Sequence, residues 1–343
     1  MVYWQKMEEY FLNAKFDDIL GQDEAKKQLK SALLMKRNII IAGPPGIGKT
    51  TIAKNIARIL PDVKANKCQY HCDPNDPLCP ECRNGKLGSI NVSGEKRFIR
   101  IQGSPDLTAE DLLGDIDPIK ALKFGPLSIE VFTPGKIFKA NRGVLFFDEL
   151  NRCPEKLQNA LLQVLEEGKV TIGSYDIELP ANFIFIGSMN PEDFAGTEKL
   201  SEVLLDRFDI IYMNYPESTI IEKEIVKTKG KKITTINFPD HLLQFMLDFI
   251  RSLRGNKDLE RAPSVRASLG LYERAQSNAL IGKKKEVDLR DLRDAVKSVL
   301  SHRIRLKPGI KYLKTPETFL EESFDKHLEE SEYKDSEKSG DFL

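Results

Sequence analysis

Short apolar runs recur along the first two thirds of the chain and give way to helical patterns after Pro216. Five of these runs predict buried strands, at residues 38–42, 97–102, 144–148, 182–187 and 209–213. Apolar residues at helical spacing separate most of the runs, which is typical of a parallel sheet covered by helices on both faces. The pattern therefore predicts an α/β core with a five-stranded parallel sheet.

The segment that follows the core, residues 216–315, has the pattern of helices alone. Pro239 lies at a predicted helix start and precedes a broad apolar stripe. Ser264 can cap a second helix, and Asp288 can cap a third that reaches about Arg305. A core at residues 1–215 followed by a small all-α domain is the predicted organisation.

Composition and charge favour a globular protein with a protein partner. The 343 residues include 52 basic and 52 acidic side chains, so no global field attracts the chain to nucleic acid or to a membrane surface. The first residues are acidic where a signal peptide would be apolar, and no apolar stretch approaches about 18 residues, so we expect a cytoplasmic location. Residues 316–343 carry an acidic excess and predict a helix that frays into a disordered tail.

A glycine-rich loop follows the first predicted strand and precedes a helical pattern. This order of strand, loop and helix is the context in which a phosphate-binding loop is expected. The loop comprises Gly43, Pro44, Pro45, Gly46, Ile47, Gly48, Lys49 and Thr50, with Thr51 next in the helix. Lys49 would reach the β- and γ-phosphates of ATP, and the Thr50 hydroxyl would hold Mg²⁺.

A pair of carboxylates completes the predicted nucleotide site. Asp148 and Glu149 lie at the carboxyl end of the strand at residues 144–148, where α/β sheets place their ligands. Asp148 would complete the Mg²⁺ shell, and Glu149 would orient and deprotonate the attacking water. An Asp-Glu pair at the start of a solvated helix is the alternative. The sequence predicts binding and hydrolysis of ATP.

About a hundred residues separate Thr50 from Asp148, many more than one crossover needs. We predict two insertions between them, at about residues 64–94 and 115–134. A third interruption, at residues 169–179, has the pattern of a hairpin. These insertions are candidates for partner contacts or for packing elements.

Four cysteines lie within the first insertion, with the spacing Cys68-x₃-Cys72-x₆-Cys79-x₂-Cys82. Structural disulfides are rare in cytosolic proteins, so this grouping favours a metal. Four thiolates would form a closed tetrahedral zinc site with a structural role. Reduced free cysteines or a redox-sensitive loop are the alternatives.

Several segments together resemble one clade of ATPases. They are Phe-Asp-Asp-Ile-Leu-Gly-Gln (16–22), the phosphate loop, and the segments at residues 140–152, 158–173, 187–192 and 204–209. The chain resembles an AAA+ ATPase of the MoxR and magnesium-chelatase I-subunit group. The resemblance implies an AAA+ core followed by a lid domain, and it implies roles for six further residues. Asn190 matches the sensor-1 residue, Arg207 the arginine finger of a neighbouring subunit, Arg266 the sensor-2 arginine, and Ile19, Gly21 and Gln22 the adenine pocket.

Simpler interpretations exist for the polar residues in this set. Asn190 precedes Pro191 and could initiate a turn, and Arg266 could lie on a helix surface. Arg207 could pair with Asp206 or Asp209. Arg142 is a possible second arginine acting on a neighbour, with a structural salt bridge as the alternative.

The resemblance implies a ring, hexameric in this group, that converts ATP hydrolysis into remodelling of a protein partner or into loading of a metal or cofactor. The implied partner carries a von Willebrand factor A domain. Neither a membrane nor a nucleic acid is an expected partner. The alternative is a DNA-dependent motor that resembles the minichromosome maintenance helicases, which would need basic residues at the hairpin tips.

Overall fold

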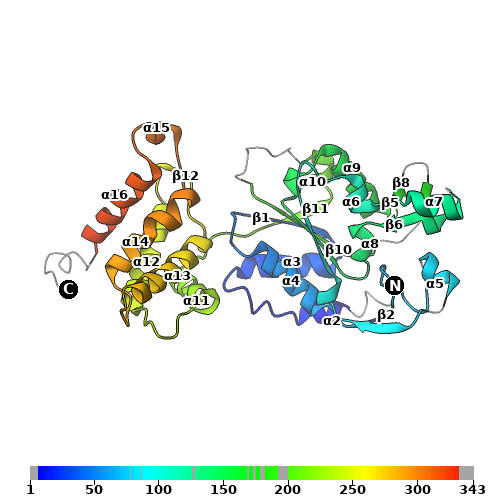
Figure 1. The fold of residues 1–343 in the computed structure, drawn as a ribbon, viewed down its shortest axis with the longest axis horizontal. Coiled ribbons are helices and arrows are strands. Elements are labelled where there is room, and N and C mark those ends of the chain that lie inside the picture. Colours follow the sequence, from blue (N-terminus) through cyan, green and yellow to red (C-terminus); the bar gives the residue numbers. More distant parts are fainter. Residues whose placement is uncertain are drawn as a thin grey trace. The chain divides into compact units, whose positions relative to one another are not determined.

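The computed structural model describes residues 7–77, 79–85, 87–125, 128–167, 170–172, 175–177, 182–191 and 200–331. The chain forms two compact units (Figure 1). The first contains Met1–Pro44 and Gly48–Met213, and the second contains Pro45–Ile47 and Asn214–Leu343. Among the described residues, none of the helices has both the length and the apolar character that a membrane span requires.

The first unit is built on a five-stranded sheet in the order β11-β1-β10-β7-β4, and all four pairings are parallel. The strands are β1 (Asn38–Ala42), β4 (Phe98–Gln102), β7 (Val144–Asp148), β10 (Ile184–Met189) and β11 (Phe208–Tyr212). β1, β7 and β10 are buried along nearly their whole length, as a sheet covered on both faces requires. The predicted five-stranded parallel sheet is confirmed.

Helices follow the strands as the apolar spacing predicts. α3 (Asp23–Leu34) packs against β1 and β11, and α4 (Lys49–Ile59) packs against β7 and β10. The other helices of this unit are α2 (Met7–Leu12), α6 (Ala109–Leu113), α8 (Lys136–Lys139), α9 (Glu155–Glu167) and α10 (Glu202–Leu205), with 3₁₀ turns at Glu95–Arg97 and Leu150–Arg152. β1, the glycine-rich loop and α4 therefore follow one another directly.

Each of the three interruptions in the core contains its own small ribbon. β2 (Val63–Asn66) pairs antiparallel with β3 (Ser89–Val92) and frames α5 (Pro80–Asn84). β5 (Gly114–Ile116) pairs with β6 (Phe132–Pro134) and frames α7 (Pro118–Phe124) and a 3₁₀ turn at Ile129–Val131. β8 (Val170–Ile172) pairs with β9 (Tyr175–Ile177), while the turn residues 173 and 174 of this hairpin lie outside the described residues.

The second unit is a helical domain with one short ribbon. Its helices are α11 (Thr219–Lys229), α12 (Asp240–Arg254), α13 (Val265–Ile281), α14 (Leu289–Leu300), α15 (Pro308–Lys311) and α16 (Pro316–Glu329). Asp288 caps α14 as predicted, but the helix ends at Leu300 and not near Arg305. A 3₁₀ turn (Ser301–Arg303) intervenes, because Arg305 and Leu306 form β13, which pairs with β12 (Leu259–Arg261).

The helix predicted at the start of residues 316–343 is present as α16, but it packs into the helical domain and is not part of a separate tail. α16 places Phe319, Leu320, Phe324 and Leu328 in the core of the helical domain. The Phe324 ring meets Phe249 edge to face, with ring centroids 5.2 Å apart. The acidic residues occupy the outer face of an amphipathic helix, so net charge alone misplaced the boundary. Residues 332–343 lie outside the described residues.

Candidate nucleotide site

Three neighbouring strands deliver the predicted catalytic residues to one edge of the sheet. The phosphate loop follows β1, Asn190 follows β10, and Glu149 follows β7. Because β1, β10 and β7 are adjacent and parallel, their carboxyl ends lie side by side. The structure thus brings Lys49, Asp148 and Asn190 to the same edge.

The phosphate loop has the backbone that the glycines permit. Gly46 and Gly48 have φ angles of 79° and 101°, values that side-chain-bearing residues rarely adopt. Gly48 is the N-cap of α4, so the first backbone N–H groups of the helix face the loop. Lys49 Nζ donates to the carbonyl oxygens of Gly43 at 2.6 Å and Pro44 at 2.9 Å. The lysine closes over the loop, where it can exchange these carbonyls for phosphate oxygens.

The segment at residues 16–22 lies against this loop. A Cβ atom on Gly48 would lie 3.1 Å from Cδ1 of the buried Ile19. Gly21 and Gln22 both have positive φ, 67° and 61°, and Gln22 is the N-cap of α3. The structure therefore places Ile19 next to the phosphate loop, and the adenine pocket stays a prediction for Ile19, Gly21 and Gln22.

Asp148 is held by both of its carboxylate oxygens. Oδ1 accepts a hydrogen bond from Ser188 Oγ at 2.6 Å, and Oδ2 pairs with the Arg100 guanidinium at 2.5 Å. The Asp148 side chain is only 13% exposed. Charge-assisted bonds of this kind fix the direction in which a carboxylate points.

Glu149 is oriented by a strained backbone and by two side chains. Its φ angle is 57°, and its backbone N–H donates to Ser188 Oγ at 3.0 Å. Oε2 accepts from Gln102 Nε2 at 2.8 Å and lies 3.3 Å from Arg152. Left-handed φ values outside glycine are uncommon and often occur at functional sites. The Glu149 carboxylate is thus oriented by different side chains from those that hold the Asp148 carboxylate.

Sequence reasoning missed the three residues that position these carboxylates: Arg100, Gln102 and Ser188. Arg100 and Gln102 alternate with Ile99 and Ile101 along β4, so they share one face of the strand. Polar residues at alternate positions of an otherwise apolar strand were the available signal. Ser188 gave no such signal, because a small hydroxyl within a buried strand is common.

Family comparisons match three segments of the chain. The descriptions are "ATPase family associated with various cellular activities (AAA)" for residues 86–210, "Magnesium chelatase, subunit ChlI" for residues 15–71, and "AAA lid domain" for residues 260–323. The magnesium-chelatase 38 kDa subunit of Acidiphilium rubrum is 33% identical over 202 residues, which are 57% of this chain and 56% of that protein. The ChlI homolog of Methanocaldococcus jannaschii is 26% identical over 326 residues, 85% of this chain and 86% of that protein.

The chain is an AAA+ ATPase of the ChlI-like kind.

Two solved structures share the fold of this AAA+ ATPase. One is the complex of the BchI and BchD subunits of magnesium chelatase, with 22% identity, a TM-score of 0.51, and coverage of 89% of this chain and 98% of that chain. The other is RuvB of Thermotoga maritima, with 19% identity, a TM-score of 0.51, and coverage of 83% and 72%. At these identities the likeness shows the fold alone. The comparisons confirm three predictions at the level of the family. They are the AAA+ fold with a lid domain, the enzyme class of ATP hydrolase, and the use of ATP with Mg²⁺.

The curated relatives also limit what is carried over. The chain spans little more than half of the Acidiphilium subunit. A chloroplast ChlI subunit from Glycine max is 34% identical over 228 residues, which are 63% of this chain and 52% of that protein. Chelatase activity is therefore stated of those proteins and not of this chain. The assignment of the chain to the MoxR group stays a prediction.

Arg207 of the AAA+ core lies at the opposite end of the sheet from the phosphate loop. It immediately precedes β11, and its neighbour Phe208 pairs with Asn38 at the start of β1. Its guanidinium pairs with Glu166 and donates to the Val203 carbonyl at 2.6 Å. Asp209 pairs instead with Arg37, at 3.0 Å.

Arg266 and Arg142 have different surroundings. Arg266 is exposed in the first turn of α13, two residues after the N-cap Ser264. Arg142 lies 3.4 Å from Asp73 and donates to the Lys64 carbonyl at 3.0 Å. These contacts support the alternative of a structural salt bridge for Arg142, and the sensor-2 role of Arg266 stays a prediction.

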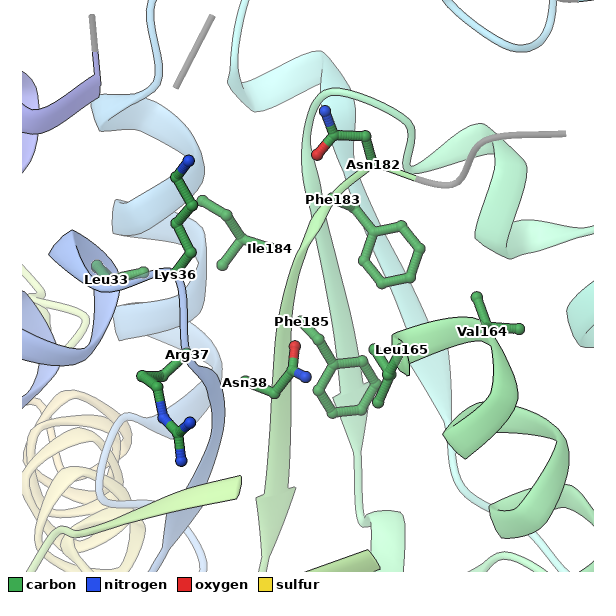
Figure 2. Close-up of a pocket in the computed structure, with 10 residues that line it drawn as sticks. All are labelled: Leu33, Lys36, Arg37, Asn38, Val164, Leu165, Asn182, Phe183, Ile184 and Phe185. Carbon is green, nitrogen blue, oxygen red and sulfur yellow. The ribbon is translucent and has the colours of Figure 1, made fainter. Parts of the chain in front are cut away.

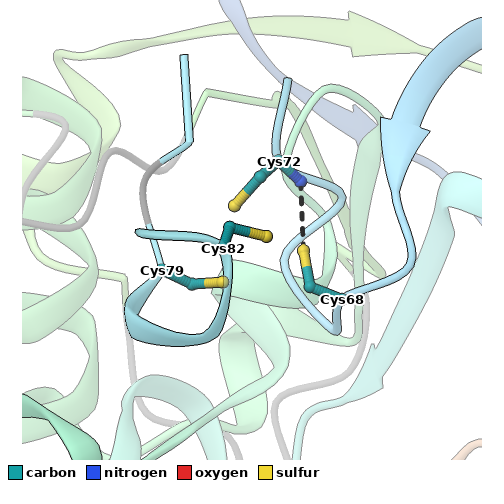
Figure 3. A group of neighbouring side chains, drawn as sticks. All are labelled: Cys68, Cys72, Cys79 and Cys82. Carbon is teal, nitrogen blue, oxygen red and sulfur yellow. Dashed lines mark hydrogen bonds between the residues drawn. The ribbon is translucent and has the colours of Figure 1, made fainter. Parts of the chain in front are cut away.

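The four clustered cysteines of the ATPase converge. Their Sγ atoms all lie within 4.8 Å of one another, and Figure 3 shows the side chains of Cys68, Cys72, Cys79 and Cys82 pointing together. All are free thiols. A hydrogen bond from the Cys72 side chain lowers the pKa of Cys68 to about 4, and burial raises the pKa of Cys82 to about 12.

A cavity of about 230 Å³ lies at the amino end of the sheet, away from the phosphate loop. Figure 2 shows it between the end of α3, the starts of β1 and β10, and the end of α9. Its lining includes Arg37, Asn38, Val164 and Phe185. The cavity is therefore separate from the predicted nucleotide site.

Proposed function

We propose that this chain is a Mg²⁺-dependent ATPase that assembles into a hexameric ring, in which a neighbouring subunit completes each nucleotide site. The ring would use hydrolysis to remodel a protein complex or to load a metal or cofactor into it. The observation that carries the proposal is the location of Arg207 relative to the phosphate loop of the same chain.

At the carboxyl edge, this chain's own residues supply most of the chemistry. Thr50 and Asp148 would hold Mg²⁺, which neutralises phosphate charge when bound. Lys49 leaves the Gly43 and Pro44 carbonyls to contact phosphate oxygens. Glu149, released from Gln102, orients a water and accepts its proton, and Asn190, immediately after the central strand β10, helps to position that water.

Arg207 cannot serve this site in its own subunit. The phosphate loop starts after the carboxyl end of β1, whereas Phe208 pairs with Asn38 at the amino end. Each residue advances a strand by about 3.3 Å, so about 16 Å separates Asn38 from Gly43. An arginine side chain does not cover that distance. A role for Arg207 at the γ-phosphate thus requires the site of a neighbouring subunit, which couples turnover to assembly.

The partner proposal has support from one exposed surface. α7 in the insertion at residues 115–134 presents Ile119, Leu122 and Phe124, which are 79%, 91% and 49% exposed. Apolar side chains grouped on one short helix are typical of a contact surface. The similar proteins are named as subunits of a magnesium chelatase, and one solved structure is a complex of BchI with BchD. The resemblance to the magnesium-chelatase I-subunit group implies a partner that contains a von Willebrand factor A domain, and we propose a partner of this kind.

Mixed rings test the proposed assembly. Arg207→Ala subunits keep Lys49 and Glu149, whereas Glu149→Gln subunits keep Arg207. Each variant alone should have little ATPase activity, and mixing them should restore part of it, because a Glu149→Gln neighbour supplies the arginine. Absence of rescue in rings shown to be mixed would contradict action on a neighbour.

Capture of the partner tests the second half of the proposal. Glu149→Gln should bind ATP, stall and retain its partner, which mass spectrometry of the co-purified proteins identifies. Leu122→Asp in the same background should release that partner while ATP binding is unchanged. Recovery of DNA-processing proteins, with ATPase stimulated by single-stranded DNA at low salt, would favour a nucleic-acid motor instead.

A further inference from the structure

The four cysteines come from two short segments that face each other. Cys68 and Cys72 lie in the loop after β2, and Cys79 and Cys82 lie at the N-cap and in the first turn of α5. A tetrahedron of sulfur atoms around zinc, at about 2.3 Å per bond, has edges of about 3.8 Å. Four free sulfurs all within 4.8 Å of one another therefore need only a small contraction to enclose the ion.

The backbone of both segments is arranged as metal-binding turns require. The Cys72 N–H donates to Cys68 Sγ at 3.4 Å, which favours a negatively charged sulfur. The Cys82 N–H donates to the Cys79 carbonyl at 3.1 Å, which turns both thiols to the same side. Cys72 and Cys79 are fully buried, Cys82 is 8% exposed and Cys68 is partly exposed, so most of the cluster is shielded from solvent. Such a site has no open coordination position and is structural in kind.

The insertion needs a stabilising element of this sort. Its ribbon, β2 with β3, has two strands, and a two-stranded ribbon is marginally stable in water. α5 has five residues, too few for a helix to persist unaided. The apolar cluster of the ribbon consists of the small side chains Val63, Ala65 and Val92. Metal binding commonly supplies the free energy that so small a core lacks.

The cysteine loop is also attached to the catalytic sheet. The buried Asn141 donates from Nδ2 to the Tyr70 carbonyl at 3.0 Å, and the Tyr70 ring lies 6.0 Å from the Phe138 ring. Arg142 reaches Asp73 within the same loop. Asn141 and Arg142 immediately precede Gly143 and β7, the strand that ends in Asp148. The loop thus supports the start of the strand whose other end carries the carboxylates.

We propose that Cys68, Cys72, Cys79 and Cys82 bind one Zn²⁺ ion, which folds the insertion at residues 64–94 and fixes it to the start of β7. This inference does not depend on the proposed ring or on its partner. It predicts a metal that is present with or without ATP.

Metal content of the full chain is the first test. Protein purified under reducing conditions and analysed by inductively coupled plasma mass spectrometry should contain about one zinc per chain. Cys79→Ser combined with Cys82→Ser should lower this to near zero. Cys153→Ser is the matched control, because Cys153 is buried but lies outside the cluster, and it should retain the zinc.

A second measurement on unmodified protein covers the case in which the double variant fails to fold. Removal of zinc with a mercurial and a chelator should make the exposed Lys67 and Arg83 the first sites of trypsin cleavage, and added Zn²⁺ should restore protection. Reduced protein that contains no zinc and takes up none would overturn the proposal, as would stoichiometric iron in its place. Cleavage that is unchanged by zinc removal would overturn the structural role.

Discussion

The two ends of the central sheet hold different kinds of polar group. At the carboxyl end, Asp148 is bound by the fully buried Ser188 and is itself 13% exposed. At the amino end, Arg207 pairs with Glu166 at side-chain exposures of 34% and 48%. Buried charge-assisted bonds hold a group in one place, whereas surface ion pairs contribute about 0–1 kcal/mol and exchange easily. The carboxylate at the carboxyl end is therefore held in place by contacts within its own chain. At the amino end, Arg207 can leave Glu166 at little cost in free energy and pair with a group on a neighbouring subunit.

The largest effect is expected from Arg207→Ala. Loss of an arginine that stabilises charge on the γ-phosphate lowers turnover by about 10³–10⁵-fold, while ATP binding is kept. Steady-state ATPase assays together with fluorescent-nucleotide binding measure both quantities. Normal turnover in the variant would remove the arginine-finger assignment and with it the main argument for a ring.

A smaller effect is expected from Ser188→Ala at the carboxyl end. Its hydroxyl donates to Asp148 Oδ1 and accepts from the Glu149 N–H, so the variant removes one hydrogen bond from each of these two atoms. We expect the free energy of unfolding to fall by about 1–3 kcal/mol and turnover to fall with it. Thermal unfolding and ATPase assays measure the two effects, and Ser252→Ala is the control. It removes a hydroxyl that donates to the Phe249 carbonyl of α12, at a position far in sequence from both carboxylates. Equal turnover in the two variants would contradict a positioning role for Ser188.

The smallest effect is expected from Arg37→Ala. Arg37 lies at the same end of the sheet as Arg207 and pairs with Asp209, with exposures of 50% and 38%. Loss of this surface pair should change the free energy of unfolding by less than about 1 kcal/mol and leave turnover nearly unchanged. Chemical denaturation and ATPase assays check both. A loss of turnover as large as that in Arg207→Ala would show that the whole amino end, and not one arginine, acts on the neighbour.

The sequence was sufficient to predict the sheet and the main residues of its carboxyl edge. Strand β1, the glycines and Lys49 form a contiguous signal, and Asp148 and Glu149 end a run of four apolar residues. Both signals are local, because a buried parallel strand must be apolar and a phosphate loop needs glycine at left-handed φ. Such features can be found without knowledge of the three-dimensional contacts.

The parts that could not be predicted depend on contacts between distant segments. Arg100 reaches Asp148 across the pairing of β4 with β7, and Arg207 meets Glu166 of α9. The sequence showed that four cysteines are grouped, but only the structure shows that their sulfur atoms converge. The end of α14 was also missed, since pairing of β12 with β13 overrides helical propensity after Leu300.

Helix α16 has a practical consequence for how the protein is produced. Its sequence is rich in acidic residues, so a boundary chosen by charge would cut the chain near residue 315. That cut would remove Phe319, Leu320, Phe324 and Leu328 and leave the rings of Phe245 and Phe249 without their aromatic neighbours. Each large apolar side chain contributes about 1.5–3 kcal/mol when buried, so the shortened protein would lose most of a typical domain's stability. Expression of the helical domain on its own should therefore extend at least to Ser331.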